Sequence, residues 1–293
     1  MKKFAVIGHP ISHSKSPALH QAGFIDLEID AEFLAVDVLP KNLETWLKKD
    51  FQNFEGAAVT IPHKENIRKY LDQESMIAQK IGAVNTLFWQ NGKICGTNTD
   101  VVGVLKSIIN VFNPSNQNIL ILGAGGAARA TIFGLQITGA NVFLWNRTKE
   151  KAIKIANEFD PTNYQKIKKS STSSDCENNV SFLESIKKAD IKQIQVIDDF
   201  SDSKKFDLVI NTTSVGLHEW KSVVPENFWH KSHVAFDIVY DPLETKFLSD
   251  AEKAGAITIS GDKLLVYQAL EQFKMWNNVE LDPEVMEHAF FEN

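Results

Sequence analysis

Four short polar segments in the first hundred residues contain the side chains best suited to chemistry. Each lies just beyond an apolar run, and together they supply hydroxyls, an amide, Lys64 and Asp100. This set suits a substrate that carries several hydroxyl groups and a carboxylate. A lysine beside an aspartate is also able to move the proton of a reacting hydroxyl group. The segments are SHSKSP (12–17), TIPHK (60–64), AVNT (83–86) and GTNTD (96–100).

Taken one at a time, these residues have structural explanations as well. Asp100 directly precedes an apolar helical stripe, which is the usual place of an N-cap residue. Ser16 stands before Pro17, and this pair predicts a helix N-cap followed by a first-turn proline. Lys64 alone resembles any solvated lysine. The chemical interpretation therefore depends on whether the four segments converge.

The histidines and cysteines do not predict a metal site. His63, next to Lys64, is expected to be a local packing group or a surface group rather than a second base. Cys95 and Cys176 lie far apart, so neither a disulfide framework nor a zinc site is expected, and a reducing cytosol fits. No acidic or cysteine partner matches the spacing of His9, His13 and His20.

The bulk composition narrows the class of protein. A length of 293 residues suggests two domains. The net charge of −6 implies no broad basic field, so neither nucleic acid nor an anionic membrane surface is an expected partner. No apolar run approaches 18 residues, and the N-terminal MKKFAVIG is typical of a first strand rather than of a signal sequence. We therefore expect a cytoplasmic globular protein.

A glycine-rich segment, GAGGAA (123–128), follows an apolar strand and opens an apolar helix. In a dinucleotide-binding turn, Gly123 would permit the tight bend and Gly125 the close approach of a pyrophosphate. Ala128 would let the helix pack against the strand, and the helix N-terminus favours phosphate charge. The alternative is a tight turn that binds no ligand.

The strand that follows distinguishes between two cofactors. Enzymes that bind NAD place an acidic residue about 20 positions beyond the glycines, where it binds the ribose 2′-hydroxyl. Here NVFLW (141–145) ends in NRT (146–148), without a carboxylate. Arg147, with Lys149 or Lys151, is able to pair with a 2′-phosphate instead. Cations are disfavoured at a helix N-terminus, so the basic residues at this helix start favour a role in binding the 2′-phosphate. The sequence therefore predicts NADP over NAD.

The elements that must position these residues alternate between strand and helix, which predicts an α/β fold with parallel sheets and ligand sites at the carboxyl ends of the strands. Asn91-Gly92 predicts a type I′ hairpin, and Pro114 with SNQN (115–118) is a plausible domain boundary. Strands are predicted at 3–7, 32–38, 56–61, 85–90, 93–97, 118–122, 141–145, 207–211 and 234–239. Helices are predicted from Ser16 to about Glu28, around 43–47, from Pro62 to about Ile81, at 101–108, up to about Thr138, from about Lys149, up to Ala254, at 262–277 and at about 282–290.

Taken together, the motifs resemble those of the shikimate dehydrogenase family, whose members use NADP in aromatic amino-acid (chorismate) biosynthesis. The resemblance covers most of the chain and excludes roughly 160–205, a polar stretch whose composition is typical of a flexible loop. The motifs occur in order as SHSKSP, TIPHK, GAVNT, NTD, GAGGAAR, NRT, NTTS (211–214), DIVYDP (237–242) and LVYQA (265–269).

The resemblance implies two domains with the active site in a cleft between them. Residues 1–101 plus about 265–293 would form the substrate-binding domain, and about 102–264 a Rossmann-type NADP-binding domain. The implied reaction is the reversible, NADPH-dependent reduction of 3-dehydroshikimate to shikimate by a monomer or homodimer. Lys64 would donate a proton to the forming alkoxide or stabilise it by charge, and Asp100 would orient Lys64.

The resemblance also implies the remaining site residues, and no metal. The implied substrate-binding residues are Ser14, Ser16, Thr60, Lys64, Asn85, Asp100, Tyr240 and Gln268. The implied NADP-binding residues are Gly123, Ala124, Gly125, Gly126, Ala127, Asn146, Arg147, Thr148, Lys151, Thr212, Ile238 and Gly261.

The sequence departs from the family pattern at several positions, and two alternatives to the implied function remain open. Lys151 replaces a frequent arginine, which would soften a preference for NADP. The nearest alternative is a quinate/shikimate dehydrogenase that uses NAD, and the absence of an acidic residue at 146–148 argues against it. A non-catalytic NADP or metabolite sensor is the second alternative, and retention of both Lys64 and Asp100 argues against it. The other departures are Ala58, Asp262, Lys263 and Leu264.

Overall fold

The computed structural model describes residues 1–163 and 190–292, so most of the polar stretch at 160–205 lies outside the described residues. The described residues form two compact units. The first contains residues 1–103 and 265–292, and the second contains residues 104–163 and 190–264. Both unit boundaries fall within helices, because α4 (Asp100–Ile109) and α10 (Gly261–Asn277) each begin in one unit and end in the other.

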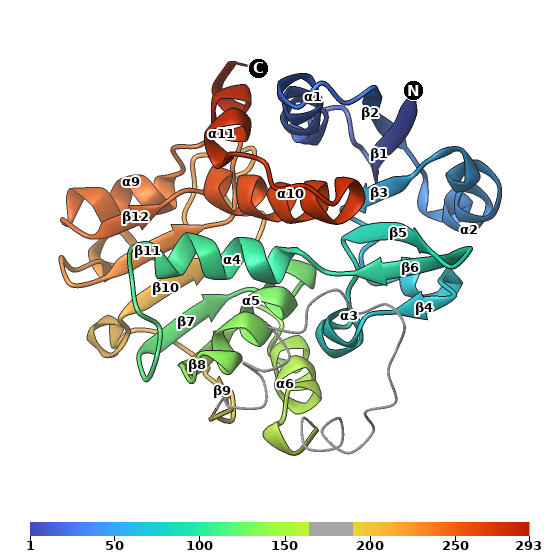
Figure 1. Ribbon diagram of the computed structural model, residues 1–293. Helices are drawn as coiled ribbons and strands as arrows, with labels where there is room; N and C mark the ends of the chain where they lie inside the picture. Colours follow the sequence, from blue (N-terminus) through green and yellow to red (C-terminus); the bar gives the residue numbers. More distant parts are fainter. Residues whose placement is uncertain (164–189, 293) are drawn as a thin grey trace. The chain divides into compact units, whose positions relative to one another are not determined.

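The first unit is built on a six-stranded mixed sheet, and the order of its strands is β2-β1-β3-β5-β6-β4 (Figure 1). β1 pairs in parallel with β2 and β3, whereas β5 is antiparallel to both β3 and β6. The strands are β1 (Lys2–Gly8), β2 (Ala31–Asp37), β3 (Gly56–Val59), β4 (Gln73–Glu74), β5 (Thr86–Gln90) and β6 (Lys93–Thr97). The predicted parallel sheet is therefore wrong for this unit.

The hairpin that sequence predicted explains the antiparallel part. Asn91 and Gly92 have φ angles of 53° and 72°, and a type I′ turn needs positive φ at both central residues. A two-residue turn joins only antiparallel strands, so the turn that was predicted correctly is also what makes the sheet mixed.

The helices of the first unit agree only in part with the prediction. α1 (Ser16–Asp26) keeps Pro17 in its first turn, but the capping residue is Lys15, so Ser16 is not the N-cap. The residues around Trp46 form no single α-helix: α2 (Leu43–Thr45) lies between a 3₁₀ turn at Pro40–Asn42 and a wider π turn at Trp46–Asp50. α11 (Pro283–Glu292) contacts α1 along the chain's C-terminal end.

The predicted helix from Pro62 to Ile81 is wrong. It is divided into a 3₁₀ turn at Ile67–Tyr70, the short strand β4, and α3 (Met76–Ile81). The Ser75 hydroxyl accepts a hydrogen bond from the Ala78 amide at 3.1 Å, which gives α3 its own N-cap. A local cap and the pairing of β4 with β6 therefore divide the stretch for which a single helix is predicted.

The second unit is built on a six-stranded sheet, β12-β11-β10-β7-β8-β9, in which every neighbouring pair is parallel. β7 reads NILIL with four buried residues, as expected for a strand covered on both faces. β12, a strand of three residues with two of them exposed, gave no sequence signal. The elements are β7 (Asn118–Leu122), α5 (Gly126–Ile137), β8 (Asn141–Trp145), α6 (Lys149–Glu158), β9 (Gln195–Val196), β10 (Leu208–Asn211), β11 (Val234–Asp237), α9 (Lys246–Lys253) and β12 (Ile257–Ile259).

Within residues 1–163 and 190–292, no helix has both the length and the apolar character needed to cross a membrane.

Candidate active site

Strand order in the first unit brings the polar segments to one edge of its sheet. β5 runs antiparallel to β3, so its start lies beside the end of β3, and the Val59 amide donates to the Asn85 carbonyl at 2.8 Å. β6 in turn ends where β5 begins, and Thr86 is paired with Thr97. The convergence expected for a parallel sheet is thus produced by two strand reversals.

Lys64 and Asp100 form a close ion pair at this edge. Nζ of Lys64 lies 2.6 Å from Oδ2 of Asp100. The Lys64 side chain retains 18% of its surface, and that of Asp100 retains 7%. The Lys64 backbone is fixed as well, because its carbonyl accepts the Val84 amide at 2.8 Å. The pair therefore has one partly open, cationic end and one buried, anionic end, which suits proton transfer to a group that approaches Lys64.

Asp100 is held in place by asparagines rather than by a second charge. Nδ2 of Asn85 donates to Oδ1 of Asp100 at 2.8 Å, and the Asp100 amide donates to Oδ1 of Asn98 at 3.0 Å. The first turn of α4 closes on the Thr99 carbonyl, so Thr99 stands at the cap position and the predicted N-cap assignment of Asp100 is wrong. As the first helical residue, Asp100 still places its negative charge at the favourable end of the helix.

Gln268 reaches the same network from α10. Its Oε1 accepts from Nδ2 of Asn85 at 3.4 Å, a long hydrogen bond, while its Nε2 donates to the Leu265 carbonyl at 2.9 Å. The side chain is 6% exposed. Four of the predicted residues, Lys64, Asn85, Asp100 and Gln268, are thus joined by hydrogen bonds.

Ser14, Ser16 and Thr60 lie beyond the ends of β1 and β3, two neighbouring parallel strands. Within the described residues, their hydrogen bonds are local: the Ser16 amide donates to Oγ of Ser14 at 3.3 Å, and the Thr60 amide donates to the Ile7 carbonyl at 2.9 Å. They share the sheet edge with the network without being bonded to it.

Sequence reasoning missed the residues behind Asn85. Thr86, Thr99 and Gln272 are all buried and hydrogen-bond to the Asn85 side chain or backbone. The signal was present, because Thr86 and Thr99 stand inside the quoted segments and Gln272 follows Gln268 by one helical turn.

The buried histidines of this unit are neutral packing groups. Nε2 of His63 donates to the Val38 carbonyl at 2.6 Å, and burial lowers the pKa of His63. His20 is stacked on Phe33 with ring centroids 4.3 Å apart, and burial lowers the pKa of His20 to about 3. Neither offers a second base beside Lys64.

The glycine-rich turn of the second unit has the form that a pyrophosphate requires. Gly123 has a φ angle of 118°, and a Cβ there would lie 2.6 Å from Oγ1 of Thr212, so only glycine fits. At Gly125, by contrast, a Cβ would meet no atom within 4 Å. Gly125 also caps α5, so its open side faces the helix N-terminus, where phosphate charge is favoured. Ala124 lies in this turn, and Gly126 and Ala127 are the first two residues of α5.

The end of β8 presents cations without a carboxylate. Arg147 and Lys151 are exposed and have no ion-pair partner within the described ranges, whereas Lys149 pairs with Asp198. Nδ2 of Asn146 donates to the Thr148 carbonyl at 2.8 Å, which shapes the turn around Arg147. This arrangement fits a 2′-phosphate, and Lys149 is the least available of the three cations named from sequence.

The last group of predicted cofactor residues is organised by Asp237, a fully buried carboxyl at the end of β11. It accepts from Nδ2 of Asn211 at 2.9 Å, from the Thr245 hydroxyl at 2.7 Å and from the Val239 amide at 3.1 Å. These bonds fix the segments that carry Thr212, Ile238 and Tyr240. Gly261 lies against the same segment, since a Cβ there would be 2.5 Å from the Val239 carbonyl oxygen.

The electrostatics of these two groups follow from burial. Burial raises the pKa of Asp237 to about 6, and its three hydrogen bonds oppose that rise. Burial also raises the pKa of the Tyr240 hydroxyl, with the nearby charge of Asp241 acting in the same direction. Tyr240 is therefore a neutral hydrogen-bonding group at ordinary pH.

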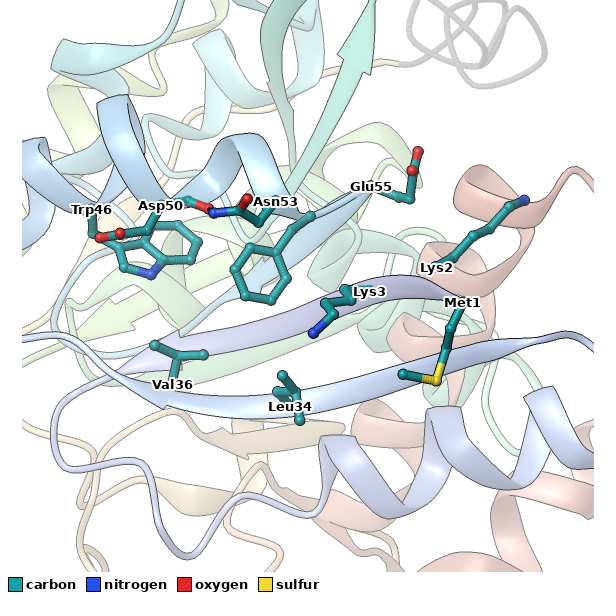
Figure 2. Close-up of a pocket in the computed structure, with 10 residues that line it drawn as sticks. Met1, Lys2, Lys3, Leu34, Val36, Trp46, Asp50, Asn53 and Glu55 are labelled. Atoms are coloured by element: carbon teal, nitrogen blue, oxygen red, sulfur yellow. The ribbon is translucent and has the colours of Figure 1, made fainter.

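The structure also contains a hollow away from the residues named above. It lies toward the start of β1 and β3, beneath the turns that follow α2, and its walls mix apolar side chains with a charged rim (Figure 2). None of the predicted site residues lines it. Its lining is Met1, Lys2, Lys3, Leu34, Val36, Trp46, Asp50, Asn53, Phe54 and Glu55. Across the described chain, no group of three or more histidine, cysteine, aspartate or glutamate side chains is placed to hold a metal ion.

A parallel sheet with a glycine-rich turn, together with a lysine–aspartate pair in a mixed α/β unit, defines a dinucleotide-dependent oxidoreductase. Residues 6–87 match the profile of the shikimate dehydrogenase substrate binding domain, and residues 105–179 match that of shikimate/quinate 5-dehydrogenase. The chain belongs to the shikimate dehydrogenase family.

Individual relatives cover nearly the whole chain. A Methanococcus maripaludis protein named shikimate dehydrogenase (NADP(+)) is 40% identical, over 98% of this chain and 96% of its own length. One of the same name from Maridesulfovibrio salexigens is 36% identical, over 96% and 93%. The crystal structure of Thermus thermophilus shikimate 5-dehydrogenase in complex with NADP(H) and shikimate has a TM-score of 0.84 and 32% identity, covering 100% of this chain and 99% of that one.

Proposed function

We propose that Lys64 and Asp100 are the proton-transfer pair of an NADP-dependent shikimate dehydrogenase. The chain is an oxidoreductase that acts on a CH–OH group and interconverts 3-dehydroshikimate and shikimate, as family membership implies. The 2.6 Å contact between the two side chains, inside a hydrogen-bonded network at a sheet edge, is the observation that carries the assignment.

In the biosynthetic direction the substrate carbonyl becomes a hydroxyl. NADPH, when bound, supplies the hydride to the carbonyl carbon. Lys64 donates the proton to the oxygen, or stabilises the alkoxide by its charge, and Asp100 holds Nζ of Lys64 in place while accepting from a ring hydroxyl. In the reverse direction the proton returns to Lys64.

The remaining unit 1 residues bind the substrate in this proposal. Ser14, Ser16 and Thr60 supply hydroxyls to the carboxylate, and their place beyond β1 and β3 supports this role. Asn85 and Gln268 bind ring hydroxyls through amides whose other atoms are already fixed. Tyr240 adds a neutral hydroxyl from the second unit.

The second unit binds NADP in this proposal. The open space at Gly125 and the N-terminus of α5 would hold the pyrophosphate, with Gly123 and Ala124 in the turn and Gly126 and Ala127 in the first turn of α5. Thr212, Ile238 and Gly261 line the nicotinamide side. The adenosine end, with its 2′-phosphate, lies against Asn146, Arg147, Thr148 and Lys151.

A steady-state assay that crosses shikimate or quinate with NADP⁺ or NAD⁺ tests the proposal. The expected result is the highest kcat/KM with shikimate and NADP⁺. Equal efficiency with both cofactors would refute the preference for NADP. Turnover of quinate with NAD⁺ at a higher kcat/KM would favour the quinate dehydrogenase alternative, and tight NADP⁺ binding without turnover would favour the sensor.

We further propose a cytoplasmic enzyme that is a monomer or homodimer and binds no nucleic acid. The net charge of −6 supports the last point. Sedimentation equilibrium would measure the oligomeric state, and fractionation of cells would locate the protein.

A further inference from the structure

Behind the Lys64–Asp100 pair lies a second layer of polar side chains with no access to solvent. Gln272 of α10 is 0% exposed, and its Nε2 lies 3.0 Å from Oγ1 of Thr86 and 3.1 Å from the Asn85 carbonyl oxygen. Thr86, at the start of β5, is also 0% exposed. Oγ1 of Thr86 lies 2.7 Å from Oδ1 of Asn85.

Two backbone groups fix which way the amides point. The Thr99 amide must donate, and its partner at 2.8 Å is therefore the Asn85 side-chain oxygen, Oδ1. The Asn85 carbonyl must accept, so the Gln272 atom facing it is the nitrogen Nε2. Neither amide is able to rotate by 180° without placing two donors or two acceptors together.

The direction of the remaining bonds follows. A hydroxyl carries one proton. Nε2 of Gln272 donates to the Thr86 hydroxyl, whose other oxygen neighbours are Oδ1 of Asn85 at 2.7 Å and Oγ1 of Thr99 at 3.3 Å. The proton of the Thr86 hydroxyl therefore goes to the closer acceptor, Oδ1 of Asn85. The Asn85 amide then presents only its NH₂ group to Oδ1 of Asp100, at 2.8 Å.

We propose that Thr86 and Gln272 are positioning residues that orient the Asn85 amide, and through it Asp100 and Lys64, for proton transfer. The inference rests on the proposed role of the Lys64–Asp100 pair. Neither residue touches substrate. Each acts through Asn85, so its removal loosens the geometry of the pair without removing a reacting group.

Thr86→Val tests the proposal with a side chain of similar shape. The variant loses the donor to Asn85 and leaves Nε2 of Gln272 with one acceptor, so we expect kcat for shikimate oxidation to fall about tenfold. We expect KM for shikimate to change less than threefold, because Thr99 and Asp100 still hold Asn85. Thr86→Ser keeps the hydroxyl and should restore the wild-type kcat.

Thr97→Val is the matched control. Thr97 is paired with Thr86 across the hairpin and is also buried, but its hydroxyl bonds to Ser75, 2.8 Å away, and not to Asn85. We expect a comparable loss of thermal stability and an unchanged kcat. Gln272→Met removes the same donor from the helix side and should lower kcat in the same way.

Three results would each contradict a positioning role for Thr86 and Gln272. A wild-type kcat in Thr86→Val or Gln272→Met, a rise in KM alone, or an equal loss of kcat in Thr97→Val would overturn the proposal. If Thr86→Val does not fold, the other two variants decide. A low kcat in Thr86→Ser overturns the proposal. A wild-type kcat in Thr86→Ser, together with a low kcat in Gln272→Met, supports it. The wild-type enzyme and calorimetric binding of shikimate are measured alongside, so that failure of the shikimate assignment is seen separately.

Discussion

Each unit contains a buried aspartate that is bonded to an asparagine, Asp100 at the start of α4 and Asp237 at the end of β11, but the two carboxyls differ in their other partners. Asp100 faces Lys64 at 2.6 Å, and the lysine is still partly exposed. Asp237 accepts only from neutral donors, and no cation pairs with it in the described part of the chain. Burial raises the pKa of Asp237 to about 6.

In the proposed mechanism, this difference separates an aspartate that takes part in proton transfer from an aspartate that holds the fold. A carboxylate beside a partly exposed lysine has a charge partner that can give a proton to an approaching oxygen. A carboxyl enclosed by an amide, a hydroxyl and a backbone N–H has no such route, and its bonds instead fix the backbone around Ile238 and Tyr240. In the proposed mechanism the first unit would supply the reacting side chains, whereas the pyrophosphate of NADP would be bound mainly by the backbone of the second unit.

The largest expected effect is at Lys64. Lys64→Ala removes the proton donor and the charge, so kcat should fall by about 10²- to 10⁴-fold while KM for shikimate changes much less. Steady-state kinetics at saturating NADP⁺ would measure it. Lys106→Ala, which removes an exposed lysine of α4, is the control and should leave kcat unchanged. A near-normal kcat in Lys64→Ala would contradict the assignment.

Lys64→Arg separates the two roles left open for the lysine. Arginine keeps the positive charge but does not give up its proton at accessible pH. If the side chain acts as a fixed charge, the arginine variant retains much more activity than the alanine variant. If it acts as the acid, both variants lose kcat to a similar extent.

Protonation of Asp237 should make the free energy of unfolding depend on pH. Its pKa is raised from 3.8 to about 6, so the folded protein binds a proton more tightly than the unfolded chain does. The stabilisation from this group is complete below about pH 4 and is lost as the pH rises through about 6, by at most about 3 kcal/mol. Asp237→Asn should remove this part of the pH dependence, measured as the free energy of urea unfolding between pH 4 and 7.

Asp250→Asn is the matched control for that measurement. Asp250 is also buried in the second unit, but it pairs with Lys246 at 2.9 Å. The decline between pH 4 and 6 should persist in this variant. An identical decline in the wild type and in Asp237→Asn would show that Asp237 is not its source.

If the backbone of the glycine-rich turn binds the pyrophosphate, alanine substitutions at Gly125 and Gly123 should differ in their effects on protein stability and on NADP⁺ binding. A Cβ at Gly125 meets nothing within 4 Å, so Gly125→Ala should keep the wild-type Tm while the Kd for NADP⁺ rises about 30-fold, because the methyl group occupies the pyrophosphate's place. Gly123→Ala should lose both stability and binding, since its Cβ would lie 2.6 Å from Oγ1 of Thr212.

Gly92→Ala calibrates the cost of positive φ alone. Gly92 has a φ angle of 72° and open space around its Cβ position. The stability lost by Gly123→Ala beyond that lost by Gly92→Ala measures the close approach to Thr212. Normal NADP⁺ binding by Gly125→Ala would contradict the proposed place of the pyrophosphate.

A structural feature could be predicted from the sequence when the residues that determine it are close together in the chain. The turn at Asn91-Gly92 and the glycine-rich segment carry their own conformational requirements, so both were predictable. The break of the 62–81 helix depends on pairing between β4 and β6, which no local pattern reveals. The roles of Thr86 and Gln272 depend on a contact between two segments that are 186 residues apart in the chain. A single sequence does not show that these segments are close in space.

The smallest expected effect is at Arg147, which in the proposal is one of several groups that hold the adenosine end of NADP. It is exposed and, within residues 1–163 and 190–292, has no ion-pair partner, so it is available to a 2′-phosphate. Arg147→Ala should raise KM for NADP⁺ by about five- to tenfold, close to 1 kcal/mol, and leave KM for NAD⁺ unchanged. Lys149→Ala is the control, since Lys149 already pairs with Asp198. An equal change in KM for NADP⁺ and NAD⁺ in Arg147→Ala would mean that Arg147 contacts a part of the dinucleotide that both cofactors share. A side chain of the second unit would then contribute to binding of the dinucleotide itself, and not only to recognition of the 2′-phosphate.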